Sequence, residues 1–198
     1  MNFFSIALSL FVVLNAIGNI PLFIGLLARY EVKQQRKIII RELLIALFIL
    51  LLFSFFGESI LGLLHISQPV IGMAGGALLF IISLKMIFPK THQNEISQNE
   101  PLIVPLATPI TAGPGAIAMV MVYSEQIQSS LFMTAIILLA WLPSFLILFL
   151  SSNIKYFLGE KGLSACEKLG GMLICLIAVQ MFSSGAIKLI ETSLFSHQ

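Results

Sequence analysis

Six long runs of apolar residues constrain this chain more than any other feature of its sequence. Each run is about 20 residues or longer, the length that an α-helix needs to cross the hydrocarbon core of a membrane. Only 10% of the 198 residues are charged, whereas a soluble domain typically has about 25%. We therefore predict an all-α membrane protein with six transmembrane helices, at residues 3–28, 38–57, 68–88, 102–124, 131–152 and 168–190.

One clearly polar linker, residues 89–101, divides the chain into two halves. Residues 1–88 and 102–198 each contain three predicted spans, and together they form a single transmembrane domain. The first apolar run has no Lys or Arg before it and no small-residue cleavage site. We therefore interpret it as a membrane span and not as a signal peptide.

Lys and Arg residues are distributed unevenly among the predicted loops. The loop after the first span has five of them, the loop after the third has two and the loop after the fifth has three, whereas the other two loops have none. Because cytoplasmic loops carry an excess of Lys and Arg, we predict that these three loops, including the linker 89–101, are cytoplasmic. Both termini are then expected on the periplasmic or extracellular side.

The two halves resemble each other when the sequence is shifted by 93 positions. The segment "NAIGNIPLFI" (15–24) then aligns with "TPITAGPGAI" (108–117), so that Pro21 meets Pro114. Loops that follow equivalent spans differ in positive charge, which predicts that equivalent spans cross the membrane in opposite directions. Such an inverted-topology repeat is typical of secondary transporters that work by alternating access.

Both aligned segments interrupt a predicted span near its middle with glycine and proline residues. Irregular backbone at this depth is tolerated only where it is buried in protein or lines a cavity. Pro21 and Pro114 suit the first position of a new half-helix, because the N–H that proline lacks has no helical partner there. The N-terminus of a half-helix favours an anion, and the carbonyl end of the preceding half-helix suits an ammonium group or a cation.

The sequence therefore predicts a substrate site at the two breaks, between the first and fourth spans. The expected substrate-binding residues are Asn15, Gly18, Asn19, Thr108, Thr111, Gly113 and Gly115, and the expected helix-breaking residues are Pro21, Pro109 and Pro114. No Asp, Glu, Lys or Arg lies in the central turns of any predicted span, which favours a small zwitterionic solute with a short side chain. Kinks that serve only helix packing are the alternative interpretation of these breaks.

At these residues the chain resembles the MarC family, small inner-membrane proteins of bacteria and archaea. That family carries "NPxGNxP" in its first span and "PLATPLxAGPGAI" in its fourth, where this chain has "NAIGNIP" and "PLATPITAGPGAI". Ala16 stands where the family usually has proline, so we expect the first break to be less sharply kinked. The resemblance covers essentially the whole chain. It implies kinship with the LysE transporter superfamily, a location in the bacterial inner membrane, and transport of small neutral amino acids such as glycine and alanine.

The leading hypothesis is a secondary transporter that works with no catalytic residue, metal or resident cofactor, with Na⁺ or H⁺ as a possible coupling ion. Membrane lipid is an expected partner, and nucleic acid is not. The alternatives are an exporter of another small metabolite or drug, and a membrane partner protein that transports nothing. An intramembrane enzyme is disfavoured, because the sequence has no paired nucleophile and base and no zinc-ligand spacing. The exact substrate, direction, coupling ion and oligomeric state stay open.

Overall fold

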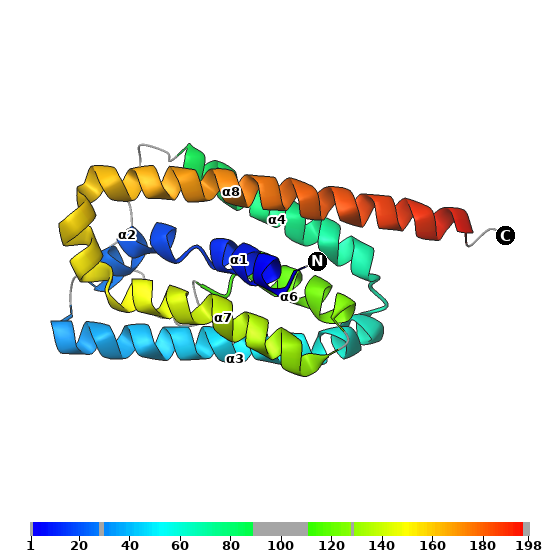
Figure 1. Cartoon of the computed structure of the whole chain (residues 1–198), viewed down its shortest axis with the longest axis horizontal. Helices are drawn as coiled ribbons and strands as arrows, with labels where there is room; N and C mark the ends of the chain where they lie inside the picture. The colour runs from blue at the N-terminus through cyan, green and yellow to red at the C-terminus, as the bar shows by residue number, and fades with distance from the viewer. Residues whose placement is uncertain (1, 28–29, 89–110, 128, 196–198) are drawn as a thin grey trace.

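The computed structural model describes residues 2–27, 30–88, 111–127 and 129–195. Within these ranges the chain forms helices and no strand, which confirms the all-α prediction for this part of the protein (Figure 1). The helices are α1 (Phe3–Leu14), α2 (Ala16–Leu27), α3 (Val32–Leu64), α4 (Gln68–Ile87), α6 (Pro114–Gln126), α7 (Ser130–Phe149) and α8 (Ser151–Phe195).

Five of the helical segments are long and apolar enough to cross a membrane. They are Phe3–Pro21, Lys33–Gly57, Gln68–Ile87, Ser130–Phe149 and Lys161–Thr192. These segments correspond to the predicted spans one, two, three, five and six. The predicted fourth span, 102–124, is described only from residue 111, and the 13 residues of α6 are too few to cross on their own. The count of six spans therefore stays a prediction.

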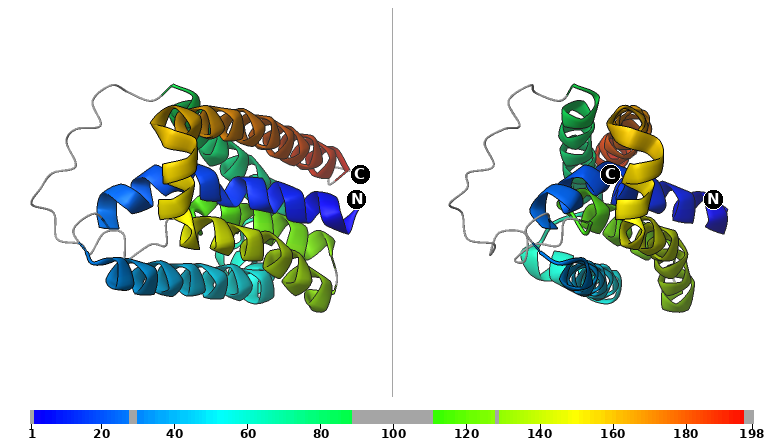
Figure 2. Two further views of the ribbon diagram at one scale, coloured as in Figure 1. Left: turned by 60° about the vertical axis from the view of Figure 1, so that its left-hand side comes forward. Right: turned by 90° about the vertical axis from the view of Figure 1, so that its left-hand side faces the viewer.

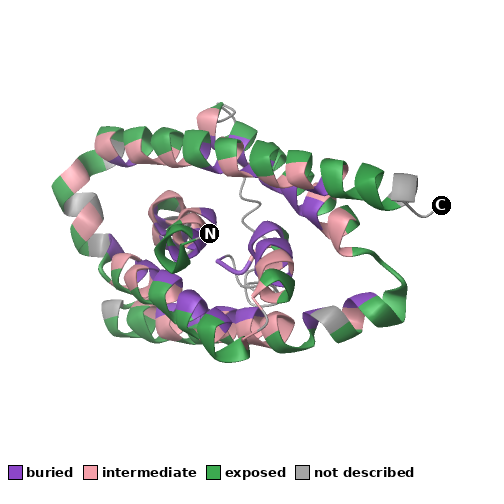
Figure 3. Ribbon diagram, turned by 45° about the vertical axis from the view of Figure 1, so that its right-hand side comes forward, coloured by how far each residue is buried: buried purple, intermediate pink, exposed green. Residues whose placement is uncertain are grey.

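The outside of the helix bundle exposes many large apolar side chains (Figure 3). They occur on α1, α3, α4, α7 and α8, for example at Phe4, Phe48, Phe80, Leu142 and Leu176. An apolar surface of this extent would associate in water, whereas lipid tails solvate it. The exposed faces therefore suit a protein embedded in a membrane.

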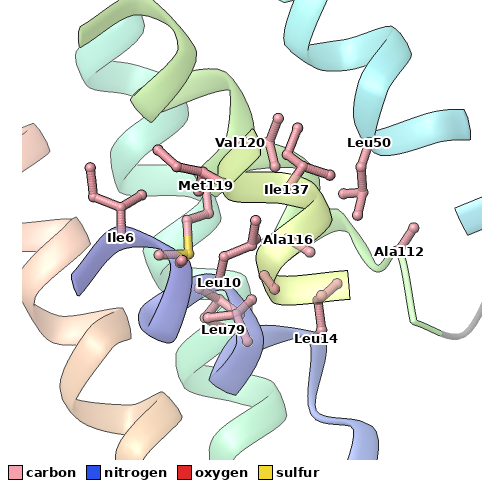
Figure 4. Packing of buried hydrophobic residues seen from close by; sticks show 14 of the residues in the cluster. Ile6, Leu10, Leu14, Leu50, Leu79, Ala112, Ala116, Met119, Val120 and Ile137 are labelled. Carbon is pink, nitrogen blue, oxygen red and sulfur yellow. The ribbon is translucent and has the colours of Figure 1, made fainter. Parts of the chain in front are cut away.

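Two clusters of buried apolar side chains form the interior. The larger one lies among α1, α3, α4, α6, α7 and α8 and includes Leu10, Met119 and Ile137 (Figure 4). The second one joins α2 to parts of α3, α7 and α8 and includes Ile20 and Leu43. The larger cluster is the one that positions the candidate site.

Helices α4 and α8 run antiparallel and pack closely along their length (Figure 1). A β-carbon built at Gly72 would lie 3.7 Å from Cα of Gly185, and one at Gly171 would lie 2.9 Å from Cβ of Met86. Small residues at such positions let two helix backbones approach, the usual way in which helices associate in membranes.

Helices α3 and α7 are also antiparallel. The indole Nε1 of Trp141 donates a hydrogen bond of 2.9 Å to the carbonyl oxygen of Leu43. Further along the same helices, the guanidinium carbon of Arg36 lies 5.5 Å from the ring centre of Phe149. These contacts fix the register of the pair.

Three segments that we predicted to be loops are largely helical, and one of them follows the second predicted span, where α3 continues to Leu64. Helix α3 begins at Val32, so that most of the first cationic loop belongs to it, and the segment between the fifth and sixth predicted spans belongs to α8. Lys, Arg, Gln and Glu have high helix propensities, which explains why these polar segments continue the helices. Within α8 the chain changes direction at Gly159, whose φ of 65° and ψ of 178° are accessible mainly to glycine (Figure 2).

Candidate functional site

The first predicted break is a single residue in the left-handed conformation. Asn15 has φ 51° and ψ 44°, and α2 begins directly after it at Ala16. Asparagine adopts this conformation more readily than most residues. The prediction that Pro21 begins a new half-helix is wrong, because Pro21 lies inside α2. There it removes the helical hydrogen bond that residue 21 would donate to the carbonyl of Ile17.

The polar groups of the first break have partners within the protein. The side-chain amide of Asn15 donates to Sδ of Met86 at 3.3 Å, and that of Asn19 donates to the carbonyl oxygen of Leu14 at 3.3 Å. A β-carbon at Gly18 would lie 2.5 Å from Oδ1 of Asn15, so only glycine leaves room for the asparagine side chain. Asn15, Gly18 and Asn19 therefore form one packed unit.

The second predicted break is described from Thr111 onward, and Thr108 and Pro109 lie outside the described residues. Gly113 is extended, with φ −64° and ψ 165°, and Pro114 is the first residue of α6. Thr111 is 4% exposed, and its Oγ1 has no hydrogen-bond partner in the part of the chain that the structure describes. The N-cap residue of α6 is Gly113, which has no side chain that could cap the helix. Among the described residues, the Thr111 hydroxyl at this break is thus left unpaired.

Gly113 and Gly115 have different surroundings. A β-carbon at Gly113 would meet no described atom within 4 Å, so there is open space beside it. A β-carbon at Gly115 would lie 2.6 Å from Cγ of Leu79 in α4. Glycine at 115 allows α4 and α6 to pack, whereas glycine at 113 leaves room at the start of α6.

The fold brings the two breaks to the same apolar cluster (Figure 4). Leu14, the last residue of α1, belongs to it, as do Ala112 and Ala116 on either side of the start of α6. A molecule bound beside Gly113 would therefore lie near both breaks.

A cavity of about 460 Å³ lies among α1, α4, α6 and α8. It falls within the usual size range of small-molecule pockets. Its polar lining residues are Ser9, Gln68, Tyr123, Gln126, Gln180, Ser184 and Lys188. The two glutamines Gln180 and Gln68 donate hydrogen bonds within the protein. Gln180 Nε2 donates to Ser184 Oγ at 3.2 Å, and Gln68 Nε2 donates to the carbonyl oxygen of Val122 at 3.0 Å.

Our sequence reasoning did not predict this cavity. The available signal was the spacing of Gln180, Ser184 and Lys188 at intervals of four residues, which places them on one face of an otherwise apolar helix. Met119 lines the cavity and also belongs to the buried cluster of Ala112 and Leu14. Leu10, Leu79 and Ala116 belong to the same cluster as Met119, Leu14 and Ala112 (Figure 4), so the cavity and the breaks adjoin one apolar cluster.

The fold and the apolar surface define an all-helical integral membrane protein. Comparison of sequences makes the assignment more specific: the profile of the family described as "MarC family integral membrane protein" matches residues 1–190. This chain belongs to the MarC family.

Several relatives are similar over nearly their whole length. The "UPF0056 inner membrane protein YhgN" of Escherichia coli (strain K12) is 41% identical over 185 residues, which cover 91% of this chain and 94% of the relative. A "UPF0056 membrane protein" of Buchnera aphidicola subsp. Baizongia pistaciae is 38% identical over 187 residues, with 91% and 94% covered. One from Chlamydia trachomatis serovar D is 37% identical over 181 residues, with 89% of each chain covered. No solved structure matches the chain.

Proposed function

We propose that this protein is a secondary transporter of small neutral amino acids such as glycine and alanine. The observation that carries the proposal is the buried hydroxyl of Thr111 at the start of α6, which has no hydrogen-bond partner among the described residues, two residues before Gly113, where a β-carbon would meet no described atom within 4 Å. A buried polar group without a partner costs about 1–3 kcal/mol, which a bound polar solute would offset. The positive end of the helix dipole favours a carboxylate at this position.

The size and charge of the site support a small zwitterion. Thr111 and Gly113 carry no formal charge, so they cannot neutralise a charged solute. A solute with both a carboxylate and an ammonium group has no net charge and therefore suits this site. The carboxylate would lie at the start of α6, and the ammonium group would face carbonyl groups at the end of α1. Leu14, Ala112 and Ala116 leave an apolar wall for a short side chain.

The directions of the helices support an inverted repeat. The predicted equivalents α3 and α7 are antiparallel, and so are α4 and α8. Repeats that face opposite sides of the membrane allow one site to open alternately to each side. We propose that the substrate binds at the breaks and that the two halves rock around it.

The distribution of charge supports an orientation in the membrane. Lys33 and Arg36 at the start of α3 and Lys85 near the end of α4 lie at the end of the bundle opposite to the cavity. The positive-inside rule favours this end as cytoplasmic. We propose that the cavity and both termini face the outside. We also propose that this chain resides in the inner membrane, like the relative named an inner membrane protein.

Uptake into proteoliposomes tests the proposal. Purified protein should take up labelled glycine and alanine in a saturable way, and unlabelled small neutral amino acids should compete whereas lysine should not. Thermal unfolding of the protein in detergent, with and without glycine, measures binding independently of transport. Protein that is folded but neither binds nor transports these amino acids would contradict the proposal. That result would favour an exporter of another solute or a partner protein without transport activity.

A further inference from the structure

Helix α3 carries a buried carboxyl group that the proposed transport site does not use. Glu42 is 5% exposed, and its Oε2 has no hydrogen-bond partner among the described residues. It lies inside the candidate membrane span Lys33–Gly57. Ile39 and Ala46, three residues before and four after it, are also buried, so all three share the inward face of α3.

The described side chains of the neighbouring helices α2, α6 and α7 include no positive charge that could pair with this carboxyl group. Helix α7 packs along α3 and has no Asp, Glu, Lys or Arg, and neither has α2. The charged residue of α6 is Glu125, next to Ser124, which bonds to Ser54 about three turns of α3 away from Glu42.

The other charges near this end of the bundle have different surroundings. On α3 itself, Arg41 is exposed, and Arg36 lies over the ring of Phe149. On α8, Lys161 is exposed and Glu167 is half-buried. None of these groups forms an ion pair with Glu42 in the part of the chain that the structure describes.

An ionised carboxylate in such surroundings is disfavoured, because burial removes its hydration and the charge of the exposed neighbour Arg41 offsets that loss only in part. Ionisable residues inside membrane spans are rare, and they commonly mark ion pathways and proton relays. Building on the proposed function, we propose that Glu42 is the proton-binding residue that couples transport to a proton gradient. In each cycle Glu42 takes up one proton from one side of the membrane and releases it to the other.

A proton fits this position better than Na⁺. Glu42 is flanked on its own face by the apolar residues Ile39 and Ala46, which supply no side-chain oxygen. A proton needs only the carboxyl oxygen, and its binding removes the charge that burial disfavours.

Helix α3 connects Glu42 to the proposed substrate site. Ala46 and Leu50 lie one and two turns further along the same face. Both belong to the buried cluster that contains Ala112, the residue after Thr111. Leu50 and Ala112 lie near each other in Figure 4. The eight residues from Glu42 to Leu50 span about 12 Å of helix. A shift of α3 on protonation of Glu42 would therefore move Leu50 and change its packing in the cluster next to the second break.

Replacement of Glu42 tests the inference. Glu42→Gln keeps the shape of a protonated carboxyl group and prevents its ionisation, and Glu31→Gln, at an exposed position just before α3, is the matched control. Two properties are measured in proteoliposomes: accumulation of labelled glycine driven by a pH gradient, and exchange of labelled for unlabelled glycine without a gradient. Glu42→Gln should lose accumulation and keep exchange, and Glu31→Gln should keep both.

The possible failures can be told apart. Accumulation that persists in Glu42→Gln, or that is driven by Na⁺ alone in the wild type, overturns the role of Glu42 and leaves the proposed transport intact. Absence of both activities in the wild type overturns the proposed transport and its coupling. Infrared difference spectra of the reconstituted protein add a readout without transport. The carbonyl band of a protonated carboxyl group should titrate with pH in the wild type and in Glu31→Gln and be absent from Glu42→Gln, and a wild type without that band overturns the inference.

Discussion

The two predicted breaks occupy equivalent places when the two halves of the sequence are aligned, but the hydrogen bonding of their polar side chains differs. At the first break, the amides of Asn15 and Asn19 bond to Met86 and Leu14, and Gly18 makes room for the Asn15 side chain. At the second break, the hydroxyl of Thr111 is buried without a described partner, and there is open space beside Gly113. The side-chain amides of the first break are therefore bonded within the protein, whereas the Thr111 hydroxyl of the second break has no partner among the described residues.

The residues that follow each break explain part of this difference. A residue before proline is biased toward an extended backbone, and Gly113, which precedes Pro114, is extended. Ile20 precedes Pro21 but stays helical, and it is 0% exposed in the second apolar cluster. Tertiary packing therefore overrides the local preference at the first break and lets α2 begin five residues earlier, at Ala16.

The largest effect is expected from filling the space at the second break. Gly113→Leu should abolish glycine uptake because the side chain would occupy the proposed site, and its folding should be little changed because no described atom lies within 4 Å. Gly62→Leu is the matched control, since Gly62 also has open space around it but lies on α3 away from the breaks. Uptake in proteoliposomes and thermal unfolding in detergent check both variants. Unaltered transport by Gly113→Leu would show that the site lies elsewhere.

The corresponding change at the first break should act on stability. Gly18→Ala places a β-carbon 2.5 Å from Oδ1 of Asn15, and such overpacking costs about 1–3 kcal/mol. Gly113→Ala should leave the unfolding temperature nearly unchanged, because its β-carbon has room. Thermal unfolding of the two variants side by side measures the contrast. Equal destabilisation by both would mean that the second break is packed as tightly as the first.

The sequence predicted an interruption near Asn15 and a helix start at Pro114, but not how the first interruption is built. Glycine, proline and asparagine interrupt apolar runs visibly, and five of the predicted spans appear as long apolar helices. The restart of the helix at Ala16 depends on the packing of Ile20 against distant residues, which no local pattern contains. For the same reason the burial of Glu42, which lies next to Arg41 near the start of the predicted span 38–57, was not predicted from the sequence.

Replacement of Thr111 should have a smaller effect, raising the stability of the ligand-free protein and weakening the binding of glycine. Thr111→Val keeps the shape of the side chain and removes the unpaired hydroxyl, so the ligand-free protein should gain about 1 kcal/mol of stability. Glycine should then stabilise the variant less than it stabilises the wild type, because the hydroxyl no longer meets the solute. Thermal unfolding with and without glycine separates the two effects. Loss of stability in the ligand-free variant would indicate that Thr111 has a structural partner.

The smallest effect is expected from replacing Asn19, whose side-chain amide bonds to the carbonyl oxygen of Leu14 at the first break. Asn19→Ala removes the hydrogen bond to the carbonyl of Leu14, and such bonds in membrane proteins contribute about 0.6 kcal/mol on average. Alanine also has a higher helix propensity than asparagine, which offsets part of this loss. Asn153→Ala, at an exposed position in the first turn of α8, is the control for the gain in helix propensity from asparagine to alanine. The difference in unfolding temperature between the two variants reports the bond itself. Substrate affinity should change little, because the ammonium group is proposed to face backbone carbonyl groups at the end of α1 and not the Asn19 amide, and a large loss of glycine binding in Asn19→Ala would show that this amide itself contacts the solute.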